Sequence, residues 1–190
     1  MSDLTDFLPE IKSLQKRFGF GYLVETGTGK NSHGLRVADA MGLSAYSCDV
    51  SEACVENAST MYPEAIVVQM ESTAFLRNVC KQSMRESVFF WLDAHFSDSG
   101  VYLWPLFAEL ETLRDNRDCS RDVIWCDDMQ HVADPLNPIR DQRVGFDLPD
   151  GTVWPGDTTH PIVEYVSPFL DTHTALIVGT VLRFTPKEPK

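Results

Sequence analysis

A buried strand, a glycine-rich turn and the start of a helix follow one another in residues 20–34. This segment reads Phe20-Gly21-Tyr22-Leu23-Val24-Glu25-Thr26-Gly27-Thr28-Gly29-Lys30-Asn31-Ser32-His33-Gly34. The apolar run up to Val24 predicts a strand that is covered on both faces. Gly27 and Gly29 predict a tight turn in which a ligand can approach the backbone closely. We therefore expect a strand–turn–helix unit whose turn binds a ligand.

The same alternation of strand and helix extends along the chain to residue 126. Helical spacing of apolar residues predicts helices over residues 4–18, 32–41, 51–61, 72–84 and 103–114, with Ser51 as an N-cap. Short apolar runs predict further strands over residues 44–48, 65–69, 87–92 and 122–126. This order predicts a doubly wound, mostly parallel sheet with helices on both faces, which is a Rossmann-like α/β fold.

The composition changes after Asp128. Residues 129–161 contain five prolines, and we expect them to form an inserted loop or hairpin on the substrate side of the sheet. Residues 162–169 predict a last helix, and residues 174–185 predict two strands broken near Gly179. The length of 190 residues fits one domain, which begins with an N-terminal helix within residues 1–19.

The charge balance and the cysteines bear on partners and location. The chain has 16 Lys and Arg against 28 Asp and Glu, a formal net charge of −12. This acidity argues against a nucleic-acid partner, and no apolar run reaches the roughly 18–20 residues of a membrane span. The five cysteines form no CxxC pair, so we expect reduced thiols and a cytoplasmic location. The sequence does not decide between a monomer and a homo-oligomer.

Three ligands compete for the turn after the first strand. A phosphate-binding loop fails, because Gly29-Lys30 is followed by Asn31 and lacks the required earlier glycine. A dinucleotide fingerprint is imperfect, and a merely structural turn stays open. S-adenosylmethionine fits best, because an acid stands at the end of the first strand and another at the end of the second. The predicted cofactor contacts are Glu25, Thr26, Gly27, Thr28, Gly29, Asp49, Glu71 and Asp93.

Four ligand-type side chains follow two neighbouring strands of the predicted sheet. Asp93 and His95 come after the strand at 87–92, and Asp127 and Asp128 come after the strand at 122–126. Such oxygen-rich groups suit Mg²⁺, Mn²⁺ or Ca²⁺, and a histidine shifts the preference toward Mn²⁺. A cation here would lower the pKa of a substrate hydroxyl. Two alternatives remain: His95 acts as general base without a metal, or these groups have structural roles only.

Several of these motifs together resemble the class I S-adenosylmethionine-dependent methyltransferases. The similarity is greatest to a bacterial branch with the motifs E-T-G-T (Glu25–Thr28), F-W-L-D-G/A-H (Phe90–His95) and D-D (Asp127-Asp128), and it spans about residues 20–185. The resemblance implies about seven strands, with a last antiparallel strand at the sheet edge. It also implies cofactor contacts at Glu25, Gly27, Gly29 and Asp49, and a metal held by Asp93, Asp127 and Asp128.

The resulting hypothesis is a methyltransferase that O-methylates a small hydroxylated acceptor, such as a sugar or a sugar-bearing metabolite. Asp93, His95 and Asp127 are its predicted catalytic residues. S-adenosylmethionine is the predicted cofactor, with Mg²⁺ or Mn²⁺ as a candidate metal. Two alternatives stay open: a non-catalytic binding module with the same fold, and a metal-dependent hydrolase or lyase that uses the Asp/His cluster.

Overall fold

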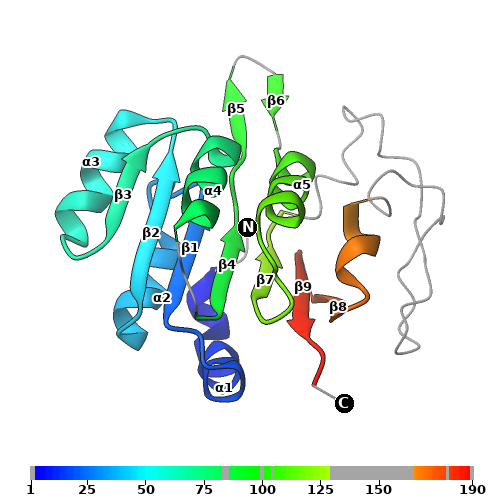
Figure 1. Cartoon of the computed structure of the whole chain (residues 1–190). Helices are drawn as coiled ribbons and strands as arrows, with labels where there is room; N and C mark the ends of the chain where they lie inside the picture. Colours follow the sequence, from blue (N-terminus) through cyan, green and yellow to red (C-terminus); the bar gives the residue numbers. More distant parts are fainter. Residues whose placement is uncertain are drawn as a thin grey trace.

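The computed structural model describes residues 3–82, 86–98, 101–103, 105–128, 165–178 and 180–188. A seven-stranded sheet forms its centre, with the strand order β3-β2-β1-β4-β7-β9-β8 (Figure 1). The strands are β1 (Tyr22–Thr26), β2 (Ser44–Asp49), β3 (Ile66–Gln69), β4 (Val88–Leu92), β7 (Val123–Cys126), β8 (His173–Val178) and β9 (Val181–Pro186). The first five pair in parallel, so their carboxyl ends lie at one edge of the sheet. The predicted Rossmann-like fold class is confirmed.

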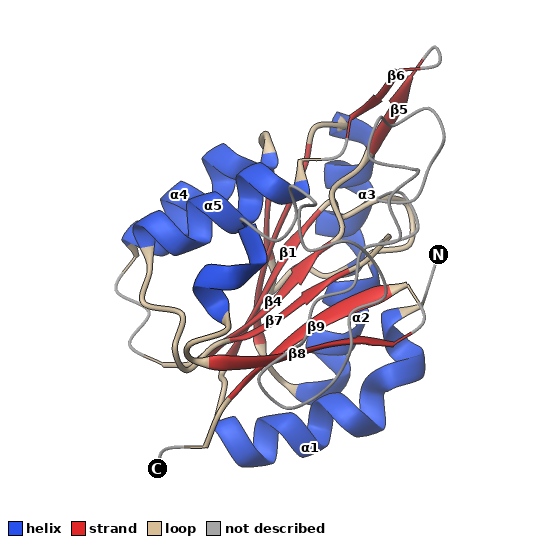
Figure 2. Ribbon diagram, turned by 90° about the vertical axis from the view of Figure 1, so that its right-hand side faces the viewer, coloured by secondary structure: helices blue, strands red, loops and turns tan. Residues whose placement is uncertain are grey.

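Helices cover both faces of this sheet (Figure 2). On one face lie η1 (Leu4–Phe7), α1 (Leu8–Phe18), α2 (His33–Met41) and α3 (Glu52–Met61); on the other lie α4 (Ser72–Lys81) and α5 (Leu106–Asn116). Ser51 caps α3 as predicted, because its side chain accepts a hydrogen bond from the Cys54 N–H. Within the described part of the chain, no helix combines the length and apolarity that crossing a membrane requires.

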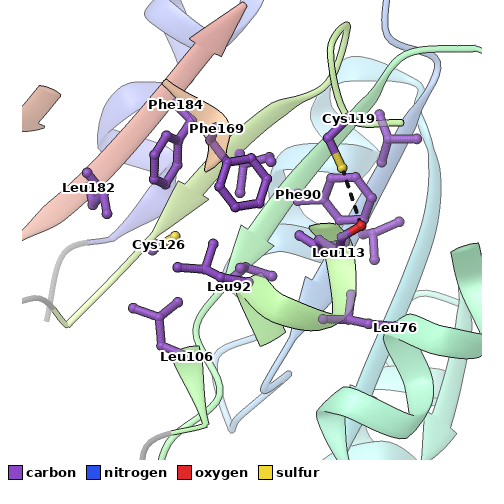
Figure 3. Close-up of a cluster of buried hydrophobic side chains, with 14 of the residues drawn as sticks. Leu76, Phe90, Leu92, Leu106, Leu113, Cys119, Cys126, Phe169, Leu182 and Phe184 are labelled. Atoms are coloured by element: carbon purple, nitrogen blue, oxygen red, sulfur yellow. Dashed lines mark hydrogen bonds between the residues drawn. The ribbon is translucent and has the colours of Figure 1, made fainter. Parts of the chain in front are cut away.

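The two hydrophobic cores follow from the alternation of side chains along each strand. In β4, Val88, Phe90 and Leu92 face the core beneath α4 and α5, part of which Figure 3 shows. The intervening Phe89 and Trp91 face the core beneath α1 and α2. Successive residues of a strand point to opposite faces, so a strand that is apolar at every position is buried on both sides. This explains why the uninterrupted apolar run predicted the central strand correctly.

The carboxy-terminal hairpin differs from the expected arrangement. β9 is antiparallel to β7, but it lies between β7 and β8, and β8 forms the edge. The implied position of the antiparallel strand at the edge is therefore wrong. The short connection makes β8 and β9 an antiparallel hairpin, and the second strand of this hairpin pairs with β7.

Other boundaries also differ from the predictions. A small hairpin of β5 (Phe96–Asp98) and β6 (Val101–Leu103) extends beyond the carboxyl edge, and no pattern predicted it (Figure 1). The helix expected from residue 103 begins at Leu106 instead. The described part of residues 162–169 contains the short helix η3 (Ser167–Phe169). The insertion predicted for residues 129–161 lies outside the described residues.

A buried arginine joins the last strand to the first long helix. Arg183 of β9 is 5% exposed, and its Nη1 donates to both carboxylate oxygens of Glu10 in α1 at 2.7 Å. The guanidinium also lies over Trp125 and Phe7, with 4.2 and 4.5 Å to the ring centroids. Contacts of this kind attract a cation to the aromatic faces. Arg183 thus anchors α1 to the sheet.

Candidate active site

The turn after β1 folds around the end of β2. The N–H groups of Gly27 and Thr28 both donate to the Cys48 carbonyl, at 2.9 and 3.0 Å. Gly27 has a φ of +75°, and a Cβ atom on it would lie 2.6 Å from the Asp93 carbonyl oxygen. A side chain would therefore collide with the backbone that leaves β4, so this position requires glycine.

Asp49, the last residue of β2, holds the same turn with its side chain. Its Oδ2 accepts a hydrogen bond from the Gly29 N–H at 2.8 Å, and its Oδ1 accepts one from the Ser51 N–H at 2.8 Å. Each carboxylate oxygen has two lone pairs, so Asp49 retains acceptor capacity for a ligand.

A cavity of about 530 Å³ opens at the carboxyl ends of the parallel strands. It lies beside β1 and β4, where the strand order reverses and where doubly wound sheets bind their ligands. Its volume is in the range of small-molecule sites. The lining residues are Gly27, Cys48, Asp49, Val50, Ser51, Met70, Glu71, Ser72, Ala94, His95 and Pro105.

Three residues predicted to contact a cofactor, Gly27, Asp49 and Glu71, lie in the wall of this cavity. Glu71 also caps α4, because its carboxylate accepts hydrogen bonds from the N–H groups of Thr73 at 3.2 Å and Ala74 at 3.0 Å. Partial burial alone would raise the pKa of Glu71, but hydrogen bonds, chiefly from Thr73, lower it below its ordinary value. Glu71 is therefore a charged acceptor beside the cavity.

Glu25 lies behind the turn rather than in the cavity wall. It is 1% exposed, and its two oxygens accept hydrogen bonds from the Gly34 N–H at 2.6 Å and the Ser47 hydroxyl at 2.7 Å. Burial raises the pKa of Glu25 to about 7, although these hydrogen bonds oppose the shift. In this structure Glu25 fixes the start of α2 against β1 and β2. Four other predicted cofactor contacts also lie outside the cavity wall: Thr26, Thr28, Gly29 and Asp93.

Sequence reasoning missed most of the remaining wall. These residues lie at or next to the ends of the predicted strands and helices, so their positions in the chain were the available signal. They are uncharged, Ala94 alone belongs to a motif quoted above, and Ser51 was singled out only as an N-cap; their convergence depends on the sheet. The missed residues are Cys48, Val50, Ser51, Met70, Ser72, Ala94 and Pro105.

A second group of polar side chains lies where β4 and β7 end. His95 Nδ1 is 2.9 Å from Asp128 Oδ2 and 3.8 Å from Asp93 Oδ1. The hydrogen bond with Asp128 raises the pKa of His95 more than partial burial lowers it. Burial and the nearby charges of Asp127 and Asp128 raise the pKa of Asp93 well above its ordinary value. His95 also lines the cavity, so this cluster adjoins the predicted cofactor site.

The two adjacent aspartates after β7 have different partners. Asp127 donates its N–H to the Leu92 carbonyl at 3.0 Å, and its carboxylate accepts a hydrogen bond from the Thr180 hydroxyl at 2.8 Å. Asp128 has a left-handed backbone, with a φ of +59°, and its carboxylate lies beside His95. The charge of Asp127 also acts on Asp93, so the metal trio of Asp93, Asp127 and Asp128 stays a prediction, although Asp127 is not in the group whose ligand atoms lie within 4.8 Å of one another. The converging group is Asp93, His95 and Asp128.

A buried glutamate that the sequence did not single out lies behind the cavity. Glu109 of α5 is 1% exposed, and burial raises its pKa to about 7. The hydroxyl groups of Ser72 and Thr26 beside it oppose this shift. Because Ser72 lines the cavity, the Glu109 carboxyl lies just behind the cavity wall.

Comparisons with known proteins support the fold. The chain matches no family model and no curated protein. It is similar to the structure of a caffeoyl-CoA O-methyltransferase-like protein from Staphylococcus aureus, with 13% identity, a TM-score of 0.56 and coverage of 98% of this chain and 84% of that one. A SAM-dependent methyltransferase from Anabaena variabilis has 10% identity and a TM-score of 0.50, over 93% and 84% of the two chains.

A third similar structure holds the cofactor. It is the magnesium protoporphyrin IX methyltransferase from Synechocystis with bound SAM, with 11% identity, a TM-score of 0.50 and coverage of 96% of this chain and 79% of that one. The chain therefore has the Rossmann-like fold of the S-adenosylmethionine (SAM)-dependent methyltransferases.

Proposed function

We propose that the protein is a SAM-dependent methyltransferase and that the cavity at the carboxyl ends of β1 to β4 binds SAM. The observation that carries this proposal is the position of Gly27, Asp49 and Glu71 around one cavity in a methyltransferase fold. Gly27 allows close approach to the backbone. Asp49 is suited to accept hydrogen bonds from the two ribose hydroxyls, and Glu71 borders the adenine.

The proposed reaction is O-methylation of a small hydroxylated acceptor, such as a sugar or a sugar-bearing metabolite. When bound, SAM supplies a methyl group on a positively charged sulfur. His95 lies in the cavity wall and is suited to orient the acceptor hydroxyl. Without a metal, its imidazole can instead take the hydroxyl proton, since Asp128 at 2.9 Å stabilises the positive charge that results. The remaining contribution of the protein is positioning.

A divalent cation fits the donor groups at this place. Asp93 Oδ1 is buried and accepts no hydrogen bond from the described residues, and its neighbours include the carboxylates of Asp127 and Asp128. Asp93 and Asp128 would hold such an ion beside the cavity. The ion would lower the pKa of an acceptor hydroxyl, so the hydroxyl would lose its proton more easily.

Calorimetric titration with SAM, and separately with its product S-adenosylhomocysteine, tests the proposed cofactor site. We expect saturable heat and an increase in the thermal unfolding temperature with each ligand. The titrations are carried out without added metal, so that they report on the cofactor site alone. Absence of heat and of a thermal shift at millimolar ligand would contradict the proposed function.

Replacement of Asp49 by asparagine tests the ribose contact. We expect D49N to weaken SAM binding by about 10–100-fold, because hydrogen bonds to a charged group contribute roughly 1.5–3 kcal/mol. An amide also has a single acceptor oxygen for the N–H groups of Gly29 and Ser51, which would disturb the turn. D39N is the matched control, because Asp39 is exposed on α2 and away from the cavity. Equal SAM affinities of D49N and D39N would exclude the contact.

A further inference from the structure

We infer that Asp93, His95 and Asp128 bind one first-row transition-metal ion, and that Asp127 is not one of its ligands. The inference deepens the proposed function, on which the catalytic use of the ion rests, by naming the ligand set and the class of metal. It departs from the set that the sequence resemblance implies, in which Asp127 takes the place of His95.

The geometry of the three side chains carries the inference. One ligand atom from each residue lies within 4.8 Å of the others. His95 Nδ1 is 2.9 Å from Asp128 Oδ2, which is close to the spacing of about 3 Å between adjacent ligands that bind one ion at about 2.1 Å. The 3.8 Å between His95 Nδ1 and Asp93 Oδ1 is below the roughly 4.2 Å between opposite ligands of such an ion.

Burial and charge point to a cation at this place. The side chain of Asp93 is 12% exposed and that of Asp128 is 2% exposed, and both carboxylates face the same imidazole. Asp93 Oδ1 accepts no hydrogen bond from the described residues. One imidazole cannot compensate both carboxylates, and a divalent ion would neutralise them. The cluster borders the 530 Å³ cavity through His95, so an ion there is accessible to a ligand.

Asp127 lies near this group, since its charge acts on Asp93, but it is not among the residues whose ligand atoms converge. Its side chain is buried, and its Oδ1 accepts the hydrogen bond from the Thr180 hydroxyl at the turn between β8 and β9, whereas its Oδ2 accepts no hydrogen bond from the described residues. Its backbone N–H extends the pairing of β7 with β4. The left-handed backbone at Asp128 then turns the chain, so that the second aspartate of the pair, and not the first, meets His95.

An imidazole nitrogen in the ligand set determines the class of metal. Mg²⁺ and Ca²⁺ prefer oxygen ligands, whereas nitrogen ligands favour Mn²⁺ and the later first-row ions. A set of two carboxylates and one imidazole therefore favours a transition-metal ion over Mg²⁺ of the same charge. Remaining coordination positions stay available to water or to an acceptor hydroxyl.

Titration of the metal-free full chain with MnCl₂, without SAM, tests the inference. We expect one Mn²⁺ per chain in electron paramagnetic resonance, bound at least about tenfold more tightly than Mg²⁺ in competition. H95Q should weaken Mn²⁺ binding about 100-fold and D127N less than about fivefold, because only the first removes a ligand. Circular dichroism and thermal unfolding show whether each variant is folded.

A spectroscopic measurement keeps the test independent of variant stability. Pulsed electron paramagnetic resonance of Mn²⁺ bound to the unmodified chain should show coupling to a nitrogen nucleus, from the imidazole of His95. The inference would be overturned if this coupling were absent or if the chain bound no Mn²⁺ at millimolar concentration. It would also be overturned if D127N lost more Mn²⁺ affinity than H95Q. Because SAM is omitted, failure here leaves the SAM titration as the separate test of the proposed function.

Discussion

Replacement of Gly27 by alanine is expected to lower the free energy of unfolding by about 3 kcal/mol. The left-handed backbone contributes roughly 1 kcal/mol of this for a residue with a Cβ atom, and the collision contributes roughly 2 kcal/mol. The new Cβ would lie 2.6 Å from the Asp93 carbonyl oxygen and 2.7 Å from Ala94 Cα. Both are backbone atoms, so relief requires the end of β4 to move.

Gly42 provides the matched control for this substitution. Its φ of +65° is close to that of Gly27, but a Cβ atom there would meet nothing within 4 Å. G42A should therefore cost roughly 1 kcal/mol, from the backbone conformation alone. Urea denaturation of the two variants and the unmodified chain measures both losses. Equal losses at the two positions would show that the close approach of the turn to β4 does not constrain the fold.

The second large effect is a pH dependence of stability caused by Glu109. Its pKa is about 7 in the folded protein, above the ordinary value of 4.5, because burial disfavours the charged carboxylate. The stabilising contribution of the neutral form is complete below pH 4.5 and is lost as the pH rises through 7. One pKa unit corresponds to about 1.4 kcal/mol, so the loss amounts to about 3 kcal/mol.

Comparison with E109Q isolates this contribution. Glutamine is neutral at every pH and has nearly the same shape, so the difference in unfolding free energy between the unmodified chain and E109Q should change by about 3 kcal/mol between pH 4.5 and pH 7.5. Glu25 titrates in the same direction in both proteins, so it cancels in the difference. E111Q removes an exposed carboxylate from the same helix and serves as the control. The difference in unfolding free energy between the unmodified chain and E111Q should vary by less than about 1 kcal/mol over the same pH range. A constant difference for E109Q would contradict the raised pKa.

The central fold was predictable because its signals are local. The uninterrupted apolar run of β4 and the glycine-rich turn after β1 each specify one element through neighbouring residues, and the alternation of elements then implies a parallel sheet. β5 and β6 were not predictable in this way, because strands of three residues show too little periodicity. The place of β9 between β7 and β8 depends on the docking of a hairpin, which no local pattern encodes.

In the candidate site, too, the residues that follow from local sequence signals were predictable, and those that depend on distant contacts were not. Gly27 and Asp49 follow predicted strands directly, so the topology alone places them at one edge. The proposed exchange of Asp127 for His95 as a metal ligand rests on the left-handed backbone of Asp128 and on the contact of Asp127 with Thr180, 53 residues after it in the chain. Glu109 resembles the exposed glutamates of other amphipathic helices in sequence, and its burial follows from how α5 packs.

The contact between Arg183 and Glu10 joins residues that are 173 positions apart. During synthesis on the ribosome, α1 therefore emerges long before its partner exists, and the sheet lacks an inner strand until residues 181–186 have been made. The parallel half of the sheet with its ligand cavity can form earlier, but its β7 edge remains open to other extended chains in that interval. Nascent chains that stall before residue 181 should therefore be aggregation-prone.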